Sequence, residues 1–107
     1  MICIGEQLRM LKIFDGNDSL YITWVNVNPA GFVINTRRKP DPKYMVLHRA
    51  ICHSITKYTE MAKPGGFTER SYMKVCANNI TDLRSWVKRH GRSDESFSKE
   101  CKLCKPM

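Results

Sequence analysis

The residues best suited to chemistry in this 107-residue chain are cysteines and histidines, because thiolate sulfur and imidazole nitrogen are the usual ligands of structural zinc. Near the C-terminus, Cys101 and Cys104 form a C-x-x-C pair, which presents two sulfurs from one tight turn. In the middle of the chain, His48 and Cys52 are four residues apart, a spacing that puts both on one face of a helix or of a strand. The sequence therefore predicts a structural zinc site with these four ligands.

For the half of the predicted site that comes from the middle of the chain, other ligands are also possible. Cys76 is the alternative to His48 and would give a four-cysteine site, although a lone cysteine in an apolar strand pattern is more often a small buried hydrophobic residue. His53, next to Cys52, could also replace His48 if the chain turns there. Cys3, close to the N-terminus, is not expected to be a ligand.

Zinc competes with two other uses of the C-x-x-C pair. Lys102 and Lys105 lie beside the cysteines and favour the thiolate form that binds metal. A thioredoxin-like dithiol is disfavoured, because that motif opens a helix after a strand and only three residues follow Cys104. A lone C-x-x-C also occurs with free thiols, so the zinc content of the purified protein would decide between these readings.

The charge of the chain predicts a polyanionic partner. Lysine and arginine number 18 against 10 acidic residues, for a formal net charge of +8. Such a charge favours contact with the phosphates of nucleic acid or with an acidic protein. The basic residues form one group in the middle loop and one from the second helix to the tail, and a zinc ion that joined the tail to Cys52 would bring the groups together. The predicted nucleic-acid contacts are Arg37, Arg38, Lys39, Arg84, Lys88 and Arg89. The ordinary alternative for the helix residues is the solvated side of an amphipathic helix.

No apolar run approaches the roughly 20 residues of a membrane span, and the first residues lack the pattern of a secretory signal. We therefore expect a cytoplasmic protein without membrane contact. The balance of 42% hydrophobic and 26% charged residues is typical of a globular chain. At this length, residues 1–107 predict a single compact domain.

The first half of the chain predicts one helix and one hairpin. Residues 5–14 place apolar side chains near helical spacing and predict an N-terminal helix. Residues 20–28 and 31–37 are rich in β-branched and aromatic side chains and are joined by an Asn-Pro-x-Gly turn. They predict an antiparallel hairpin over residues 20–37.

The second half predicts strands near residues 44–49 and 71–77, with a helix as the competing prediction for the first of them. A further helix is expected near residues 80–90, with Asn79 as its N-cap. Its buried stripe would contain Ile80, Leu83, Trp86 and Val87. The predicted fold is thus α+β, a small antiparallel sheet with two helices and a C-terminal C-x-x-C turn clipped by zinc.

An enzyme is the less expected class. The three histidines, His48, His53 and His90, have no catalytic triad, zinc-protease motif or paired carboxylates around them. The leading hypothesis is a zinc-stabilised module that binds nucleic acid through phosphate contacts. The main alternative is an inhibitor or accessory protein that docks on an acidic protein surface. A small metal-dependent nuclease, with a histidine as general base, is the third.

Overall fold

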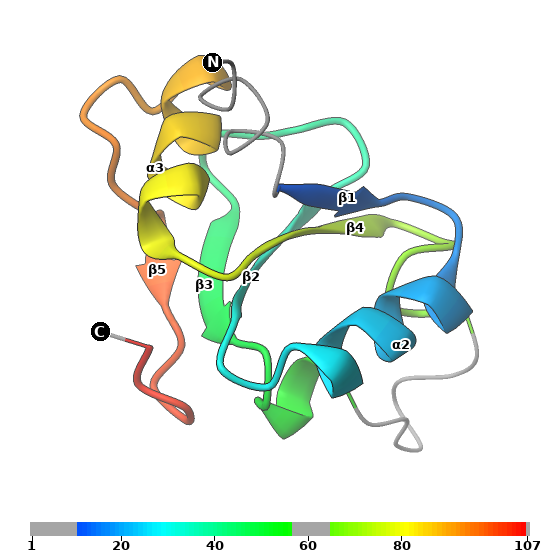
Figure 1. Ribbon diagram of the computed structural model, residues 1–107. Helices are drawn as coiled ribbons and strands as arrows, with labels where there is room; N and C mark the ends of the chain where they lie inside the picture. The colour runs from blue at the N-terminus through cyan, green and yellow to red at the C-terminus, as the bar shows by residue number, and fades with distance from the viewer. Residues whose placement is uncertain (1–10, 57–64, 107) are drawn as a thin grey trace, which may run out of the picture.

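A five-stranded mixed sheet forms the centre of the molecule in the computed structural model, which describes residues 11–56 and 65–106 (Figure 1). Its strands are β1 (Lys12–Phe14), β2 (Phe32–Arg37), β3 (Met45–Arg49), β4 (Tyr72–Ala77) and β5 (Lys99–Glu100). The strand order is β1-β4-β2-β3-β5, and all neighbours are antiparallel except β3 and β5, which are parallel. The predicted α+β class is confirmed, while the sheet is mixed because of β5.

One helix packs on each face of the sheet. Adjacent residues in a strand point to opposite faces, so Val33 joins the cluster that contains Tyr21 of helix α2 (Asp18–Val27). Ile34 belongs instead to the cluster that contains Leu83 of helix α3 (Ile80–Arg89). We call these the α2 face and the α3 face of the sheet (Figure 1).

The predicted hairpin over residues 20–37 is wrong in its first half, because residues 18–27 form helix α2. Asn17 caps this helix by accepting a hydrogen bond from the N–H of Leu20 at 2.9 Å. Tyr21 and Val25, four residues apart, are both buried against the sheet. Burial of this stripe outweighs the β propensity of the segment, since propensity is a weak preference that tertiary packing overrides.

The predicted N-terminal helix over residues 5–14 is also corrected where the structure describes it. Residues 12–14 form the edge strand β1, in which Lys12 pairs with Cys76 and Phe14 with Lys74. Residues 5–10 lie outside the described part of the chain. Pairing with β4 satisfies the backbone groups that a helix would otherwise have satisfied.

The remaining predicted elements are confirmed. Strands β3 and β4 and helix α3 lie where the sequence places them. Asn79 caps α3 by accepting from the N–H of Asp82 at 2.9 Å. Leu83, Trp86 and Val87 are buried in the α3 face, as the helical stripe predicts. Neither helix found in residues 11–56 and 65–106 combines the length and the apolar character that crossing a membrane requires.

Candidate metal centre

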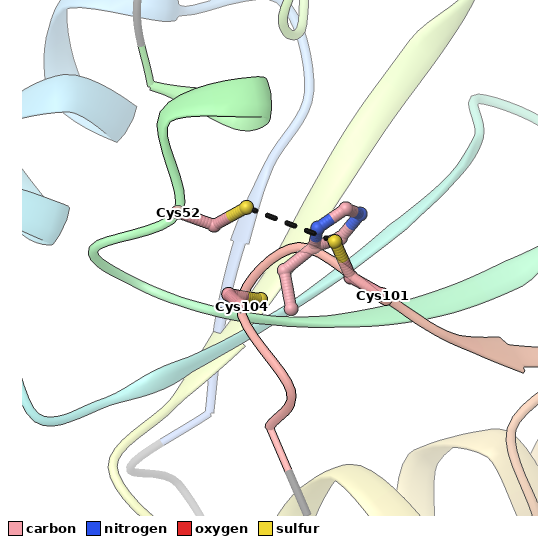
Figure 2. Close-up of side chains that lie close together, drawn as sticks. Cys52, Cys101 and Cys104 are labelled. Atoms are coloured by element: carbon pink, nitrogen blue, oxygen red, sulfur yellow. Dashed lines mark hydrogen bonds between the residues drawn. The ribbon is translucent and has the colours of Figure 1, made fainter.

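Four of the predicted ligand residues converge at the C-terminal end of β3. His48 lies in β3, Cys52 follows that strand, and Cys101 and Cys104 lie in the turn after β5. Each offers one potential ligand atom, and all four atoms lie within 4.8 Å of one another. His48, Cys52 and Cys101 are buried and Cys104 is half-buried. Figure 2 shows the three cysteine side chains close together, with those of Cys52 and Cys101 reaching toward each other across the gap between their segments.

Backbone pairing brings the C-terminal turn to this place. Strand β5 runs parallel to β3, and the N–H of Cys101 continues the ladder by donating to the carbonyl oxygen of Leu47 at 2.9 Å. The N–H of Lys105 donates to the carbonyl oxygen of Cys101 at 3.0 Å and closes the turn. The tail is therefore held by the sheet as well as by any ligand between the cysteines.

The side chain of Arg49, next to His48 in the chain, also holds the turn. Its guanidinium donates to the carbonyl oxygens of Cys104 and Lys105, each at 3.0 Å. Its backbone N–H donates to the sulfur of Cys104 at 3.2 Å. A hydrogen bond from an amide to a cysteine sulfur favours the charged thiolate, which is the form that binds metal.

The spacing of the sulfurs fits a tetrahedral metal. The Sγ atoms of Cys52 and Cys101 are 3.8 Å apart. Two sulfurs that each lie about 2.3 Å from one zinc ion at a tetrahedral angle are about 3.8 Å apart. Both cysteines are free thiols, and the sulfurs are farther apart than the roughly 2.05 Å of a disulfide.

The two thiols of the C-x-x-C turn differ in acidity. Burial opposes ionisation of Cys101, but N–H groups of Cys104 and Leu103 donate to its sulfur, and the net effect is a pKa below the usual value. Burial raises the pKa of Cys104 to about 11. Ionisation is therefore easier at Cys101 than at Cys104, and a positive charge in the cluster would favour both thiolates. A bound metal ion would supply that charge.

His48 is in the form that a metal ligand requires. Burial, and to a smaller extent the charge of Lys74, lowers the pKa of His48 to about 4, so its imidazole is neutral at pH 7. The buried Nδ1 atom has no hydrogen-bond partner within residues 11–56 and 65–106. This nitrogen can therefore bind a ligand. Binding would also remove the free-energy cost of leaving a buried nitrogen without a partner.

The alternative ligands of the sequence analysis lie elsewhere. Cys76 is fully buried in the hydrophobic cluster of the α2 face, and β2 separates it from His48, since Val33 pairs with both. Burial raises the pKa of the Cys76 thiol well above its usual value. His53 is exposed in a short 3₁₀ helix (His53–Ile55) and does not belong to the four-residue cluster. Cys3 lies outside the described residues.

The structure places three of the predicted nucleic-acid contacts at the end of β2 and in the loop that follows it, and three on α3. Arg37 lies on the α2 face at the end of β2, with its guanidinium carbon 5.2 Å from the centre of the Tyr44 ring. Arg38 pairs with Asp15 at 2.6 Å, and Lys39 is exposed in the loop that follows.

The other three contacts lie on α3, which covers the opposite face. Arg84 is half-buried, with its guanidinium carbon 5.6 Å from the centre of the Phe97 ring. Lys88 lies 3.7 Å from a carboxylate oxygen of Glu95, and Arg89 is exposed. Arg84 thus contacts the segment that leads to β5, in addition to any role in binding.

A contact that the sequence analysis missed joins the two basic segments. Arg92 donates to the carbonyl oxygen of Pro42, in the β2–β3 loop, at 2.7 Å and to that of Ser96 at 2.6 Å. Gly91, before it, packs so closely that an added Cβ would lie 2.5 Å from Pro42 Cγ. The loop and the C-terminal end of α3 therefore meet through Arg92, not through the cysteine cluster.

The sequence analysis also missed a polar and aromatic group on the α2 face. Lys74 is buried, and its ammonium donates to Asn35 Oδ1 at 2.9 Å and to the carbonyl oxygen of Phe67 at 2.7 Å. Tyr44 and Tyr72 lie beside it with their ring centres 5.7 Å apart. The signal was the two-residue spacing of Tyr72 and Lys74, which puts both on one face of β4.

The fold and the cluster define a small basic α+β protein with a candidate metal centre made by one histidine and three cysteines. Comparison of the chain with models of protein families, with curated protein sequences and with solved structures finds no match.

Proposed function

We propose that this protein is a zinc-stabilised module that binds nucleic acid through phosphate contacts. The observation that carries the metal part is the approach of His48, Cys52, Cys101 and Cys104 within 4.8 Å. These residues come from two segments about 50 positions apart in the chain, so one ion would join the sheet to the tail and stabilise the fold.

The donor set favours zinc over other common ions. Three sulfurs and one imidazole nitrogen suit a borderline-soft ion with tetrahedral geometry. Calcium and magnesium prefer oxygen ligands, which the cluster does not offer. With four protein ligands the zinc would be structural, because no position would remain for a water molecule or a substrate. This argues against the nuclease hypothesis for this site.

The net charge of +8 supports a polyanionic partner. Exposed lysines and arginines extend from the β2–β3 loop to the C-terminal end of α3, where Arg92 holds the two segments together. Charges of this kind bind phosphates with a steep dependence on salt and little dependence on sequence.

Binding of random-sequence DNA and RNA, titrated against salt, tests this function. We expect the logarithm of the association constant to fall linearly with the logarithm of the salt concentration. If neither nucleic acid binds even at low salt, the nucleic-acid hypothesis fails. An acidic protein would then be the partner to test, since the same charges would attract it.

A further inference from the structure

A cavity of about 410 Å³ opens on the α2 face of the sheet beside the candidate metal centre. This volume lies within the range of roughly 300–1,000 Å³ that is typical of small-ligand sites. The sheet contributes Asn35, Tyr44 and Val46 to its lining, and the C-terminal segment contributes Lys99, Lys102 and Leu103. His48 and Cys101 form the boundary with the metal centre, so a ligand in the cavity would lie next to the zinc-bound turn.

Tyr44 lines this cavity and lies against two further planar groups, those of Tyr72 and Arg37, which are outside the lining. The half-buried ring of Tyr44 lies near that of Tyr72, with an angle of 37° between the two planes. The guanidinium of Arg37 lies over both rings, 5.2 Å from the centre of Tyr44 and 5.6 Å from that of Tyr72. Aromatic and guanidinium planes on a sheet surface are the groups on which unpaired nucleic-acid bases stack.

Hydrogen bonds connect Lys74 through Asn35 to the hydroxyl of Tyr44. The ammonium of Lys74 can only donate, so Asn35 must turn its Oδ1 toward Lys74 and its Nδ2 toward Tyr44. Asn35 Nδ2 donates to Tyr44 Oη at 3.4 Å, a long hydrogen bond. Lys74 is itself fixed by the carbonyl oxygen of Phe67 at 2.7 Å. The ring is therefore positioned before a ligand arrives, which lowers the entropy cost of binding.

The part of the lining that the C-terminal segment contributes is basic. Lys99 pairs with Val46 in the register of β3 and β5, so its side chain lies on the α2 face with the cavity. Lys102 lies in the C-x-x-C turn, and both lysines are exposed. None of the described residues that line the cavity is acidic. A phosphate at this rim would meet the ammonium groups of Lys99 and Lys102.

We propose that this cavity binds an unpaired base of single-stranded nucleic acid, stacked on Tyr44, while Arg37, Lys99 and Lys102 bind the adjacent phosphates. The inference rests on the proposed function and names the class of nucleic acid. Bases in a duplex are paired and stacked inside the helix, so a duplex could place a base here only by flipping it out. A single strand presents its bases freely. Single-stranded DNA and RNA share this chemistry, and the experiment separates them.

Fluorescence anisotropy with the 107-residue chain, purified without a chelator, tests the inference. The probes are labelled oligothymidylate, oligouridylate and a random-sequence duplex of the same length. We expect both single strands to bind more tightly than the duplex, and Tyr44→Ala to weaken their binding at least about fivefold, the lower end expected for one stacked base. Tyr44→Phe, which keeps the ring but loses the hydrogen bond from Asn35, should weaken binding less than Tyr44→Ala does. If one single strand binds more tightly than the other, that strand is the preferred ligand.

Two lysine variants test the inference even if Tyr44→Ala does not fold. Lys99 and Lys12 are exposed lysines in the opposite edge strands β5 and β1. Lys99→Ala should weaken single-strand binding, and Lys12→Ala should leave it unchanged.

Three outcomes would overturn the inference. The first is equal binding of single strand and duplex by the wild type. The second is full binding by a folded Tyr44→Ala variant, and the third is an equal effect of the two lysine variants. In each of these cases binding still occurs, so the proposed function stands. If no probe binds at low salt, the proposed function fails together with the inference.

Discussion

The backbone N–H of Cys101 donates to the carbonyl oxygen of Leu47 at 2.9 Å, so the first cysteine of the C-x-x-C turn continues the parallel pairing of β5 with β3. This hydrogen bond joins one candidate ligand, Cys101, to the residue that precedes another, His48. The sheet therefore brings the tail to His48, and a metal ion would strengthen an association that already exists. We therefore expect the protein to keep its fold without metal, unlike small zinc domains that fold only around their ion.

Removal of the metal should loosen the tail more than the sheet. After treatment with a chelator, we expect a lower melting temperature but a far-ultraviolet circular dichroism spectrum that still shows helix and strand. The reason is that both hydrophobic clusters retain their sheet and helix contacts without the ion. Amide hydrogen exchange should increase most in residues 99–106. Complete loss of structure in the apo protein would contradict this prediction, and restoration of the melting temperature by added zinc is its control.

Substitution of the cysteines should separate ligands from core residues. Cys104→Ser should reduce the zinc content from about one ion per chain to a small fraction, because a neutral hydroxyl is a poor zinc ligand. Cys76→Ala should keep the zinc and lower the free energy of unfolding by roughly 1–2 kcal/mol, because it opens a small cavity. Elemental analysis and denaturant titration measure the two effects. Loss of zinc from Cys76→Ala, with zinc retained in Cys104→Ser, would exclude the proposed ligand set.

Gly91→Ala should destabilise the contact between α3 and the β2–β3 loop. Gly91 has a φ of 109°, and an added Cβ would lie 2.5 Å from Cγ of Pro42. Gly16→Ala is the matched control, because its φ of 88° is also positive but the nearest atom would lie at 3.9 Å. We expect Gly16→Ala to cost about 1–2 kcal/mol from the backbone alone, and Gly91→Ala to cost more. Equal losses in thermal unfolding would show that the close approach to Pro42 has no energetic effect.

The buried Lys74 should make stability depend on pH. Burial lowers its pKa from 10.5 to about 8, so between these values the unfolded chain binds more protons at this residue than the folded protein does. Stability from this residue therefore rises with pH over that interval, by at most about 1.4 kcal/mol per pH unit. Subtraction of the Lys74→Met profile from that of the wild type isolates the effect from other groups that titrate there. Parallel unfolding profiles for the two proteins would contradict the lowered pKa.

The sequence predicted the elements whose signals are local. Helix α3 has an N-cap and an apolar stripe within one short segment, and both determine it without reference to the rest of the chain. The C-x-x-C motif is likewise local, because Cys101 and Cys104 are only three positions apart. Helix α2 was mispredicted because its β-branched and aromatic residues favour a strand locally. Only the sheet beneath Tyr21 and Val25 makes a helix the better use of them.

Tertiary structure decided which residues from the middle of the chain join the candidate metal centre, and it formed the cavity beside it. His48, His53 and Cys76 are all chemically able to complete the cluster, and spacing along the chain does not choose among them. The choice follows from the parallel pairing of β5 with β3, which places the C-terminal turn beside His48. Cys76 lies in β4, two strands away from β3. Such pairing joins residues about 50 positions apart, and its energy comes from contacts that no local pattern contains.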